Sequence, residues 1–316
     1  MAARHQPIPV EPDPGAGSAT ADVHAHTTRS DGVLEPAELV RQAAAAGVRL
    51  FAIADHDNLA AFRELRRQGA PPLPDGLDLV PATEINAVTR GAGLDLLDGE
   101  LHVLGIGVDP GDAAFEATLL GQRAARRIRF DRTVERLREI GMPVDAQLAS
   151  LDPEADDALG RPTLARALMR AGFVDSVDDA FERVLSWGQP GYVPRTGLGP
   201  FEAVRAIRDA GGIASLAHFS EAPERRDVLR RLMDAGLDAL ETHHRSFDAE
   251  TRAATSAVAR ELGLIETGGT DYHGDFGLYA ESHAGLVMPA DLVARLRDAI
   301  GATRWGRETG ATIAPR

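Results

Sequence analysis

Alternation between strand-like and helical segments is the feature of this 316-residue chain that most constrains its fold. Short apolar runs, such as residues 50–54 and 212–217, are separated by segments with helical periodicity, such as 35–46 and 248–262. The other strands are expected at 20–24, 77–81, 101–107, 237–241 and 264–268, and the other helices at 58–68, 200–210 and 223–235. This alternation predicts an α/β fold of parallel strands joined by crossover helices.

Histidines and carboxylates gather at the ends of these strands. His24 and His26 follow the first apolar run, and Asp55-His56-Asp57 follows the second. A His-x-His pair at a strand end places two imidazoles on one face, because strand side chains alternate with period two. Strand ends are also where α/β barrels and open α/β sheets place their sites. Imidazole combined with carboxylate is a ligand set for first-row transition metals, so the pattern favours a hydrolytic metalloenzyme.

The order of these motifs resembles the PHP (polymerase and histidinol phosphatase) family, and the resemblance runs from about Ala21 to Gly285. The family pattern is a His-x-His, an Asp-His-Asp, a Glu, further histidines and a late Asp-x-His. Nine positions match its metal ligands: His24, His26, Asp31, His56, Glu84, His102, His218, Asp271 and His273. The resemblance implies a distorted (β/α)7 barrel with an inserted small helical domain, holding two to three divalent metals.

The resemblance also distributes the ligands among the metals. The first metal would take His24, His26, Glu84 and Asp271; the second would share Glu84 and add His102 and His218; the third would take Asp31, His56 and His273. Catalytic roles would fall to His24, His26, Asp31, Glu84 and Asp271. Because the chain has no cysteine, any metal must be held by nitrogen and oxygen ligands. Mn, Fe and Zn all accept such ligands, so the identity of the metal stays open.

The predicted barrel is interrupted by residues 112–189, where strand signals are few and a long Arg-rich helix is expected at about 115–140. We therefore expect a helical insertion domain at 112–189, the barrel at 20–111 and 190–316, and a disordered tail at 1–19. Four arginines of the long helix are expected to form a solvated face paired with nearby acids, namely Arg123, Arg126, Arg127 and Arg129.

Arginine is the basic residue at all 34 Lys-plus-Arg positions, so any phosphate clamp must be built from guanidinium groups. Arg161 lies in a segment that resembles the family's Gly-Arg-Pro-His motif, and Arg195 stands where relatives often carry Lys. Guanidinium groups there could make bidentate phosphate contacts. We expect Arg161 and Arg195 to bind substrate, and His244 to reach the mouth of the site.

Several positions depart from the family pattern, and we expect them on the substrate side of the site. They are Thr163, Phe219 and the segment 241–247, which includes Phe247. A nucleotide substrate would also need a surface on which a base can stack. Trp187, Tyr192 and Phe219 are candidates for it, whereas Phe173 and Phe181 are expected in the core.

The formal net charge of −14 argues against a broad surface for duplex nucleic acid. It leaves room for a small phosphorylated substrate, such as a nucleotide or a short single-stranded RNA. No apolar run approaches the ~20 residues of a membrane span, and no signal sequence is visible. These features predict a cytoplasmic protein without membrane contact, of undetermined oligomeric state.

The combined pattern predicts a metal-dependent phosphoesterase that hydrolyses a nucleoside 3′,5′-bisphosphate, an AMP-like nucleotide or a short oligonucleotide by a metal-bridged hydroxide. The general acid stays open among Asp55, Asp57 and a metal-bound water. Alternatives are a histidinol-phosphate phosphatase, a phosphodiesterase of small cyclic phosphates, a non-catalytic metal-binding PHP module, and a metal-dependent amide or deaminase hydrolase. The Ser30-Asp31-Gly32 continuation and the late Asp-x-His motif favour the PHP family over the last of these.

Overall fold

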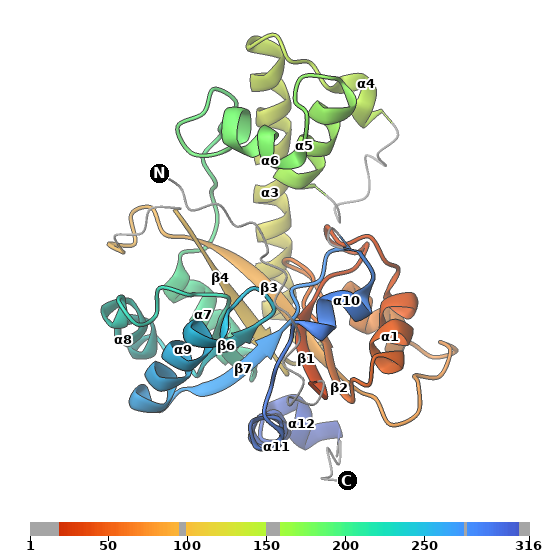
Figure 1. Cartoon of the computed structure of the whole chain (residues 1–316), viewed down its shortest axis with the longest axis vertical. Coiled ribbons are helices and arrows are strands. Elements are labelled where there is room, and N and C mark those ends of the chain that lie inside the picture. Colours follow the sequence, from red (N-terminus) through yellow and green to blue (C-terminus); the bar gives the residue numbers. More distant parts are fainter. Residues whose placement is uncertain (1–18, 95–98, 150–158, 275–276, 310–316) are drawn as a thin grey trace.

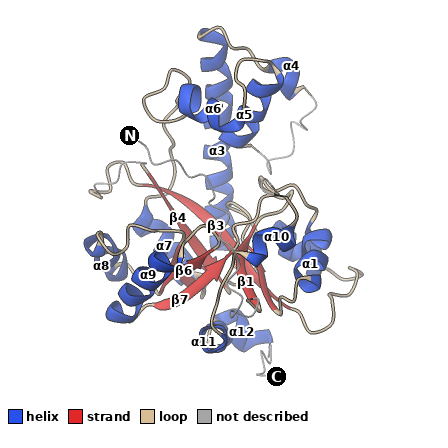
Figure 2. Ribbon diagram, viewed as in Figure 1, coloured by secondary structure: helices blue, strands red, loops and turns tan. Residues whose placement is uncertain are grey.

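Seven strands form a nearly closed barrel (Figures 1 and 2). The computed structural model describes residues 19–94, 99–149, 159–274 and 277–309. The strands follow one another in chain order: β1 (Ala21–Ala25), β2 (Leu50–Ile53), β3 (Asp78–Val88), β4 (Glu100–Ile106), β5 (Ile213–Leu216), β6 (Ala239–His244) and β7 (Ile265–Gly269). The N–H of Asp271 donates to the carbonyl of His24 at 2.7 Å, and so joins the chain after β7 to β1. The predicted seven-stranded α/β barrel is confirmed.

Strand β4 runs antiparallel to both of its neighbours, so the expectation of parallel strands throughout is wrong. No described helix lies between β3 and β4, and a direct connection of this kind makes two strands antiparallel. Strand β3 is also longer than predicted, which places Glu84 within the strand and not after its end. His102 lies near the start of β4, so the reversed direction of β4 brings it to the end of the barrel where the parallel strands finish.

Helices cover the outside of the barrel. Those at the predicted positions are α1 (Pro36–Ala45), α2 (Ala60–Arg66), α7 (Pro200–Asp209), α8 (Arg226–Asp234) and α9 (Ala249–Leu262). Three more follow the last strand, namely α10 (Tyr279–Ala284), α11 (Ala290–Gly301) and α12 (Arg304–Thr309). Their apolar faces bury Leu39, Ile207 and Leu296 against the sheet. Among the described residues, no helix combines the length and apolar character that crossing a membrane requires.

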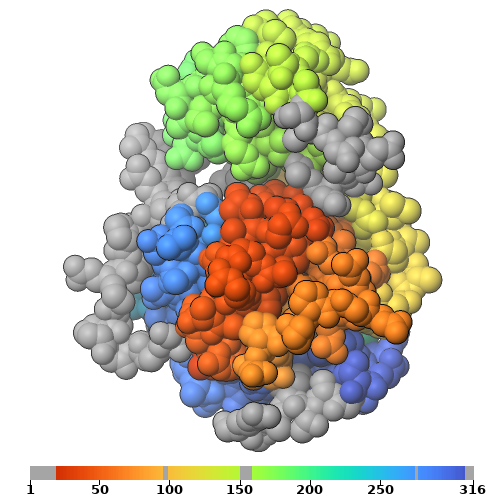
Figure 3. All heavy atoms as spheres, turned by 90° about the vertical axis from the view of Figure 1, so that its right-hand side faces the viewer, coloured from red at the N-terminus to blue at the C-terminus, as the bar shows by residue number. Residues whose placement is uncertain are grey.

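The described part of the segment 112–189 is helical and stands beyond one end of the barrel (Figures 1 and 3). It contains α3 (Ala113–Glu139), α4 (Asp145–Leu148), α5 (Arg161–Arg170), α6 (Val177–Ala180) and the π-helical turn η1 (Phe181–Leu185). Helix α3 belongs to two cores, because Phe115 and Leu119 pack with barrel residues whereas Val134 and Leu137 pack with α5. The division into barrel and insertion domain stays a prediction.

A buried carboxylate at the start of the barrel holds its two ends together. Asp22 Oδ1 accepts the N–H groups of His24 at 3.1 Å and Thr270 at 3.0 Å. Its Oδ2 accepts the hydroxyl of Tyr279, from α10, at 2.7 Å. His283 is also buried, and its Nε2 lies 2.8 Å from the carbonyl oxygen of Ala19. The remaining residues of the predicted tail, with His5, lie outside the described residues.

Candidate metal centre

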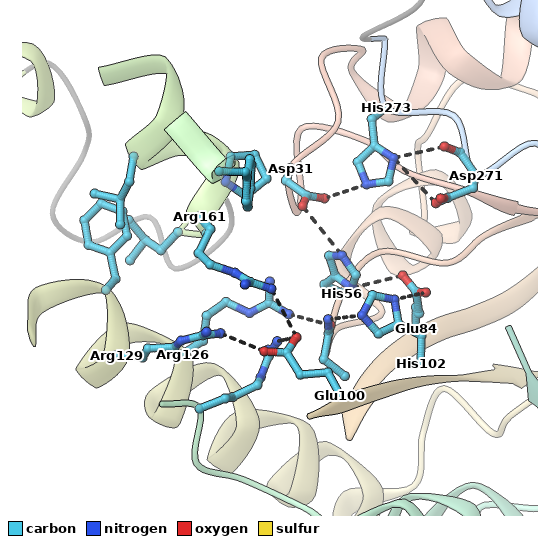
Figure 4. Close-up of a pocket in the computed structure, with 18 of the residues that line it drawn as sticks. Asp31, His56, Glu84, Glu100, His102, Arg126, Arg129, Arg161, Asp271 and His273 are labelled. Atoms are coloured by element: carbon cyan, nitrogen blue, oxygen red, sulfur yellow. Dashed lines mark hydrogen bonds and ion pairs between the residues drawn. The ribbon is translucent and has the colours of Figure 1, made fainter. Parts of the chain in front are cut away.

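The structure brings all nine of the predicted ligand residues together at one end of the barrel. They form three groups in which the possible ligand atoms lie within 4.8 Å of one another: His24, His26, Glu84 and Asp271; Glu84, His102 and His218; and His26, Asp31, His56 and His273. These groups adjoin a pocket of about 400 Å³ (Figure 4). The buried clusters are suited to more than one metal ion.

Glu84 lies at the centre of these groups because β3 points its side chain into the barrel. Its Oε1 lies 2.8 Å from His102 Nδ1 and 3.3 Å from His218 Nε2. Its Oε2 lies 3.1 Å from His56 Nδ1 and 3.3 Å from His26 Nε2. One carboxylate therefore faces ligand candidates from four different segments, a suitable position for a ligand shared between two metals.

The backbone is strained at the site. Asp57, His218 and Asp271 have φ values of 55°, 34° and 48°, and they are the non-glycine residues with positive φ in the described part of the chain. Such strain persists where the surrounding structure enforces it, commonly at functional sites. At Asp271 it accompanies a carboxylate oxygen 3.3 Å from His24 Nε2 and 3.2 Å from His26 Nε2.

Burial and mutual charge set the ionisation of the cluster. Burial opposes ionisation of Glu84, but the imidazoles of His102 and His24 outweigh it and hold the pKa of Glu84 well below its usual range. Burial likewise opposes protonation of His24, yet the carboxylates of Glu241 and Glu84 raise the pKa of His24 well above its ordinary value. The carboxylates thus remain charged, and the cluster is suited to cations.

Several buried polar atoms in the cluster make no hydrogen bond within the described part of the chain: His24 Nε2, His26 Nε2, Asp31 Oδ1 and His56 Nδ1. Buried polar groups are almost always paired, because an unpaired group loses its hydration without compensation. Imidazole nitrogens and carboxylate oxygens are ligands for divalent first-row metals. These four atoms therefore fit a metal centre better than an ordinary core.

Glu241 holds two ligand candidates of this cluster in place through hydrogen bonds. It is fully buried, its Oε1 lies 3.0 Å from His24 Nδ1, and its Oε2 accepts the backbone N–H of His218 at 2.7 Å. The expectation that the segment 241–247 lies on the substrate side is therefore wrong for Glu241. The register of β6 shifts between Glu241 and His243, which alters the alternation of side chains beyond Glu241. A carboxylate within an apolar strand was the signal for this role.

Asp55 also has a supporting position. It is buried and accepts the backbone N–H of Thr27 at 2.7 Å, the hydroxyl of Thr27 at 2.6 Å and the hydroxyl of Ser30 at 2.6 Å. These bonds hold the loop that carries Asp31. Because both carboxylate oxygens are occupied away from the pocket, Asp55 does not suit the role of general acid. Asp57 accepts a hydrogen bond from Arg126 at 2.6 Å, which leaves it in an ion pair instead.

Four arginines line the pocket, namely Arg126, Arg129, Arg161 and Arg195. We call them the arginine wall. Arg123, Arg126 and Arg129 are 15%, 14% and 9% exposed, so the expectation of a solvated helix face is wrong for these three, although Arg123 does pair with Glu116. The reason is that α3 packs over the pocket, so the side of the helix that carries Arg126 and Arg129 faces the pocket and not the solvent. Arg127 pairs with Asp131 on the surface, as expected.

Glu100 lies among these guanidinium groups. Its Oε1 lies 3.1 Å from Arg129 Nη1, and its Oε2 lies 3.5 Å from Arg161 Nη2 and 3.4 Å from Arg195 Nη1. Burial opposes ionisation of Glu100, but the three guanidinium groups outweigh it and lower its pKa to about 2. Glu100 therefore keeps its charge and holds the arginines in place.

His244 reaches the pocket, as expected. Its Nε2 lies 3.8 Å from Asp271 Oδ2, and its Nδ1 lies 2.7 Å from Ser246 Oγ. The ring of Phe247 packs beside it at 5.4 Å between centroids. Ser246 also lines the pocket, so the His244–Ser246 pair presents a polar surface next to the metal cluster.

Three of the departures from the family pattern are buried side chains that lie away from the pocket lining. Thr163, Phe219 and Phe247 are 5%, 7% and 4% exposed, and none of the three is among the described residues that line the pocket. The expectation that they lie on the substrate side is therefore wrong. Phe173 and Phe181 both pack against the core of the insertion, as expected, and Phe181 also lines the pocket.

Known proteins are similar to this chain in sequence and in fold. The chain is 32% identical over 264 residues to the 5′-3′ exoribonuclease Rnm of Salmonella typhimurium, covering 80% of this chain and 84% of that protein. It is 30% identical over 272 residues to the phosphoribosyl 1,2-cyclic phosphate 1,2-diphosphodiesterase of Eggerthella lenta, covering 85% and 99%. The chain belongs to the PHP family of metal-dependent phosphoesterases. No family model matches it.

One further relative and two solved structures are similar to this PHP phosphoesterase. It is 29% identical over 266 residues to the 3′,5′-nucleoside bisphosphate phosphatase of Chromobacterium violaceum, covering 81% and 87%. A structure from Bifidobacterium adolescentis, assigned as a metal-dependent phosphoesterase, matches with a TM-score of 0.72 and 30% identity over 90% of this chain and 98% of that one. A structure from Chromobacterium violaceum, described as an amidohydrolase with bound sulfate and no metal, matches with a TM-score of 0.69 and 26% identity over 86% and 99%. This PHP phosphoesterase is thus a hydrolase of ester bonds.

Proposed function

We propose that this enzyme hydrolyses a phosphate ester of a nucleotide or of the end of a short oligonucleotide. The observation that supports this most directly is a pocket with two chemically different walls (Figure 4). Histidines and carboxylates that could hold metals form one wall, and the arginine wall lies opposite. The relatives named exoribonuclease and nucleoside bisphosphate phosphatase make nucleotides the favoured substrate class.

The metal wall would carry the chemistry of hydrolysis. When bound, two or three divalent metals supply Lewis-acid activation of a water and neutralise charge on phosphate oxygens. We assign them to the three ligand groups described above, with Glu84 shared. Glu241, Ser30 and Asp55 would hold the ligands in place, because second-shell hydrogen bonds fix the orientation of metal-binding histidines.

The arginine wall would bind a second phosphate of the substrate. Four guanidinium groups face two carboxylates, Glu100 and Asp57, so the wall carries an excess of positive charge. The contacts of Arg161 and Arg195 with Glu100 are long, at 3.5 and 3.4 Å, which leaves further N–H donors on both side chains. Guanidinium donors are suited to bidentate phosphate contacts. Phe130 and Phe181 also line the pocket and supply apolar surface for a nucleoside.

His244 is our candidate for direct contact with the reacting phosphate. Its Nε2 is buried and makes no hydrogen bond within the described residues, although it lies beside Asp271. Such an atom is available to a phosphate oxygen or to the leaving oxygen. Ser246 would hold the ring through Nδ1.

A panel of phosphate esters tests the proposal. The Mn²⁺-reconstituted enzyme would be assayed with a nucleoside 3′,5′-bisphosphate, AMP, a 5′-phosphorylated short RNA, histidinol phosphate and a cyclic ribose phosphate. We expect kcat/KM to be highest for the nucleotides. A preference for the cyclic phosphate would instead support the activity named for the Eggerthella lenta relative, and a preference for histidinol phosphate would also overturn the substrate assignment.

The stereochemical course tests the proposed reaction separately. We propose direct attack by water without a covalent enzyme intermediate, which inverts the configuration at phosphorus. A chiral thiophosphate substrate hydrolysed in labelled water would show inversion. Retention would contradict the proposal and would point to a nucleophilic side chain, for which Ser246 lines the pocket.

A further inference from the structure

An exposed tryptophan lies on the surface beyond the arginine wall. Trp187 is 58% exposed and is the one aromatic residue among the large exposed hydrophobic side chains of the described chain. It follows η1, in the connection that descends from the insertion to α7 (Figure 1). Leaving so much of a large aromatic side chain in water is unfavourable, so burial in a core does not explain the position of Trp187.

A guanidinium group lies over one side of this indole. The Cζ of Arg90 is 4.2 Å from the Trp187 ring centroid, well within the range of a cation–π contact. Arg90 comes from the connection between β3 and β4, so two segments far apart in sequence meet at this point. The pair combines a flat aromatic surface with a positive charge.

Two ring contacts connect this pair to the arginine wall. The ring of Tyr192 packs edge-on against Trp187, with 5.2 Å between centroids. The Cζ of Arg129 lies 5.8 Å from the Tyr192 ring, and Arg129 belongs to the arginine wall. Arg90, Trp187, Tyr192 and Arg129 therefore form a row that leads from the surface to the wall, in which aromatic rings lie between cations.

We infer that Trp187 and Arg90 form a stacking subsite for a base of a single-stranded oligonucleotide whose end occupies the pocket. The inference rests on the proposed function. Aromatic rings interleaved with guanidinium groups are suited to single strands, because every base offers a face for stacking and every linkage offers a negative charge. Bases paired within a duplex are not open to such stacking. The net charge of −14 also disfavours binding of a duplex.

Substrate length provides the first test. We would compare a nucleoside 3′,5′-bisphosphate with a 5′-phosphorylated RNA pentamer, for the wild type and Trp187→Ala. Because loss of stacking on one base weakens binding by roughly tenfold or more, KM for the pentamer should rise about tenfold in the variant. KM for the bisphosphate should stay unchanged, and Trp187→Phe should retain most of the affinity for the pentamer. Met169→Ala is the matched control, since Met169 is an exposed residue of α5 at 40% exposure.

Intrinsic fluorescence provides the second test. The chain has two tryptophans, and Trp305 is 9% exposed and packs against Phe62, so a ligand-dependent change reports on Trp187. In EDTA, which prevents turnover, the pentamer should quench the fluorescence saturably, whereas AMP should not. The quenching should disappear in Trp187→Phe.

Two results would overturn the subsite. One is a pentamer that causes no quenching. The other is a Trp187→Ala variant whose KM changes equally for both substrates and whose melting temperature is lower. A contact between Arg90 and Trp187 that serves only packing would produce this combination. Failure of the wild type to hydrolyse either substrate would count against the proposed function instead, and saturable quenching by the pentamer would still support the subsite.

Discussion

Glu241 Oε1 lies 3.0 Å from His24 Nδ1, on the side of the imidazole that faces away from the pocket. The second oxygen of the same carboxylate accepts the backbone N–H of His218 at 2.7 Å. His24 and His218 belong to different ligand groups, so one buried carboxylate orients members of both. When Glu241 accepts a hydrogen bond from Nδ1–H, the other ring nitrogen of His24, Nε2, is left unprotonated and can bind a metal.

The first prediction concerns this carboxylate. In Glu241→Gln the amide cannot accept from both His24 and His218, because one of its two polar atoms is a donor. We expect metal affinity to fall by about 10–100-fold, as for other second-shell partners of metal-binding histidines. Competition with a chelator measures it. Glu266→Gln is the control, since Glu266 is a buried glutamate of the adjacent strand β7 outside the ligand groups. Equal metal affinity in both variants would contradict the assigned role.

The second prediction concerns Asp271, which lies 3.3 Å from His24 and 3.2 Å from His26. Asp271→Ala removes a charged ligand from the cluster. We expect kcat/KM to fall by about 1000-fold or more, since metal activation contributes several kcal/mol. Metal content after dialysis should fall in parallel, while circular dichroism confirms that the variant is folded. A folded variant with full metal content and normal turnover would refute the assignment.

The third prediction concerns Arg161 of the arginine wall. Arg161→Ala should raise KM for a substrate with two phosphates by about 10–100-fold, because a charged hydrogen bond contributes ~1.5–3 kcal/mol. AMP, with one phosphate, should be affected less. A fall in kcat at constant KM would show that the contact forms in the transition state. Arg127→Ala is the matched control, because Arg127 pairs with Asp131 on the surface of the same insertion. An equal effect on both substrates would exclude a second-phosphate role.

The fourth prediction is a pH dependence of stability that comes from Glu100. Burial in the folded protein opposes ionisation of this carboxyl, but the charges of Arg161, Arg195 and Arg129 outweigh it and lower the pKa from 4.5 to about 2. The stabilisation is therefore fully present above pH 4.5 and is lost as the pH falls from 4.5 towards 2. Glu100→Gln should melt at a lower temperature than the wild type at pH 7, and the difference should shrink below pH 4.5. A difference that stays constant down to pH 3 would contradict this. Glu202→Gln, at an exposed ion pair, is the control.

The fifth prediction concerns the closure of the barrel. Asp22→Ala removes the acceptor for Thr270 and Tyr279 and leaves their donors buried. We expect the free energy of unfolding to fall by about 2–4 kcal/mol, since each unpaired buried donor costs ~1–3 kcal/mol. Urea denaturation measures it. Asp291→Ala, at an exposed helix pair, should change stability little.

Much of the fold and of the candidate site was accessible from the sequence. Strand and helix alternation predicted the α/β barrel, because the two kinds of hydrophobic periodicity are local properties of the chain. The nine ligand candidates were found because histidines and carboxylates recur at strand ends in a fixed order. Boundaries such as those of α9 and β7 differ from the expected ones by at most one residue.

The tertiary structure added what depends on contacts between distant segments. The antiparallel β4 brings His102 to the site, and no local pattern reports strand direction. Arg126 and Arg129 have the spacing of a solvated helix face, yet α3 packs this face over the pocket. The carboxylate of Glu241 within an apolar strand signals some role, but its approach to His24 is what identifies that role. Local periodicity predicts which residues share a face, whereas the burial of that face, and the partners it meets, follow from long-range packing.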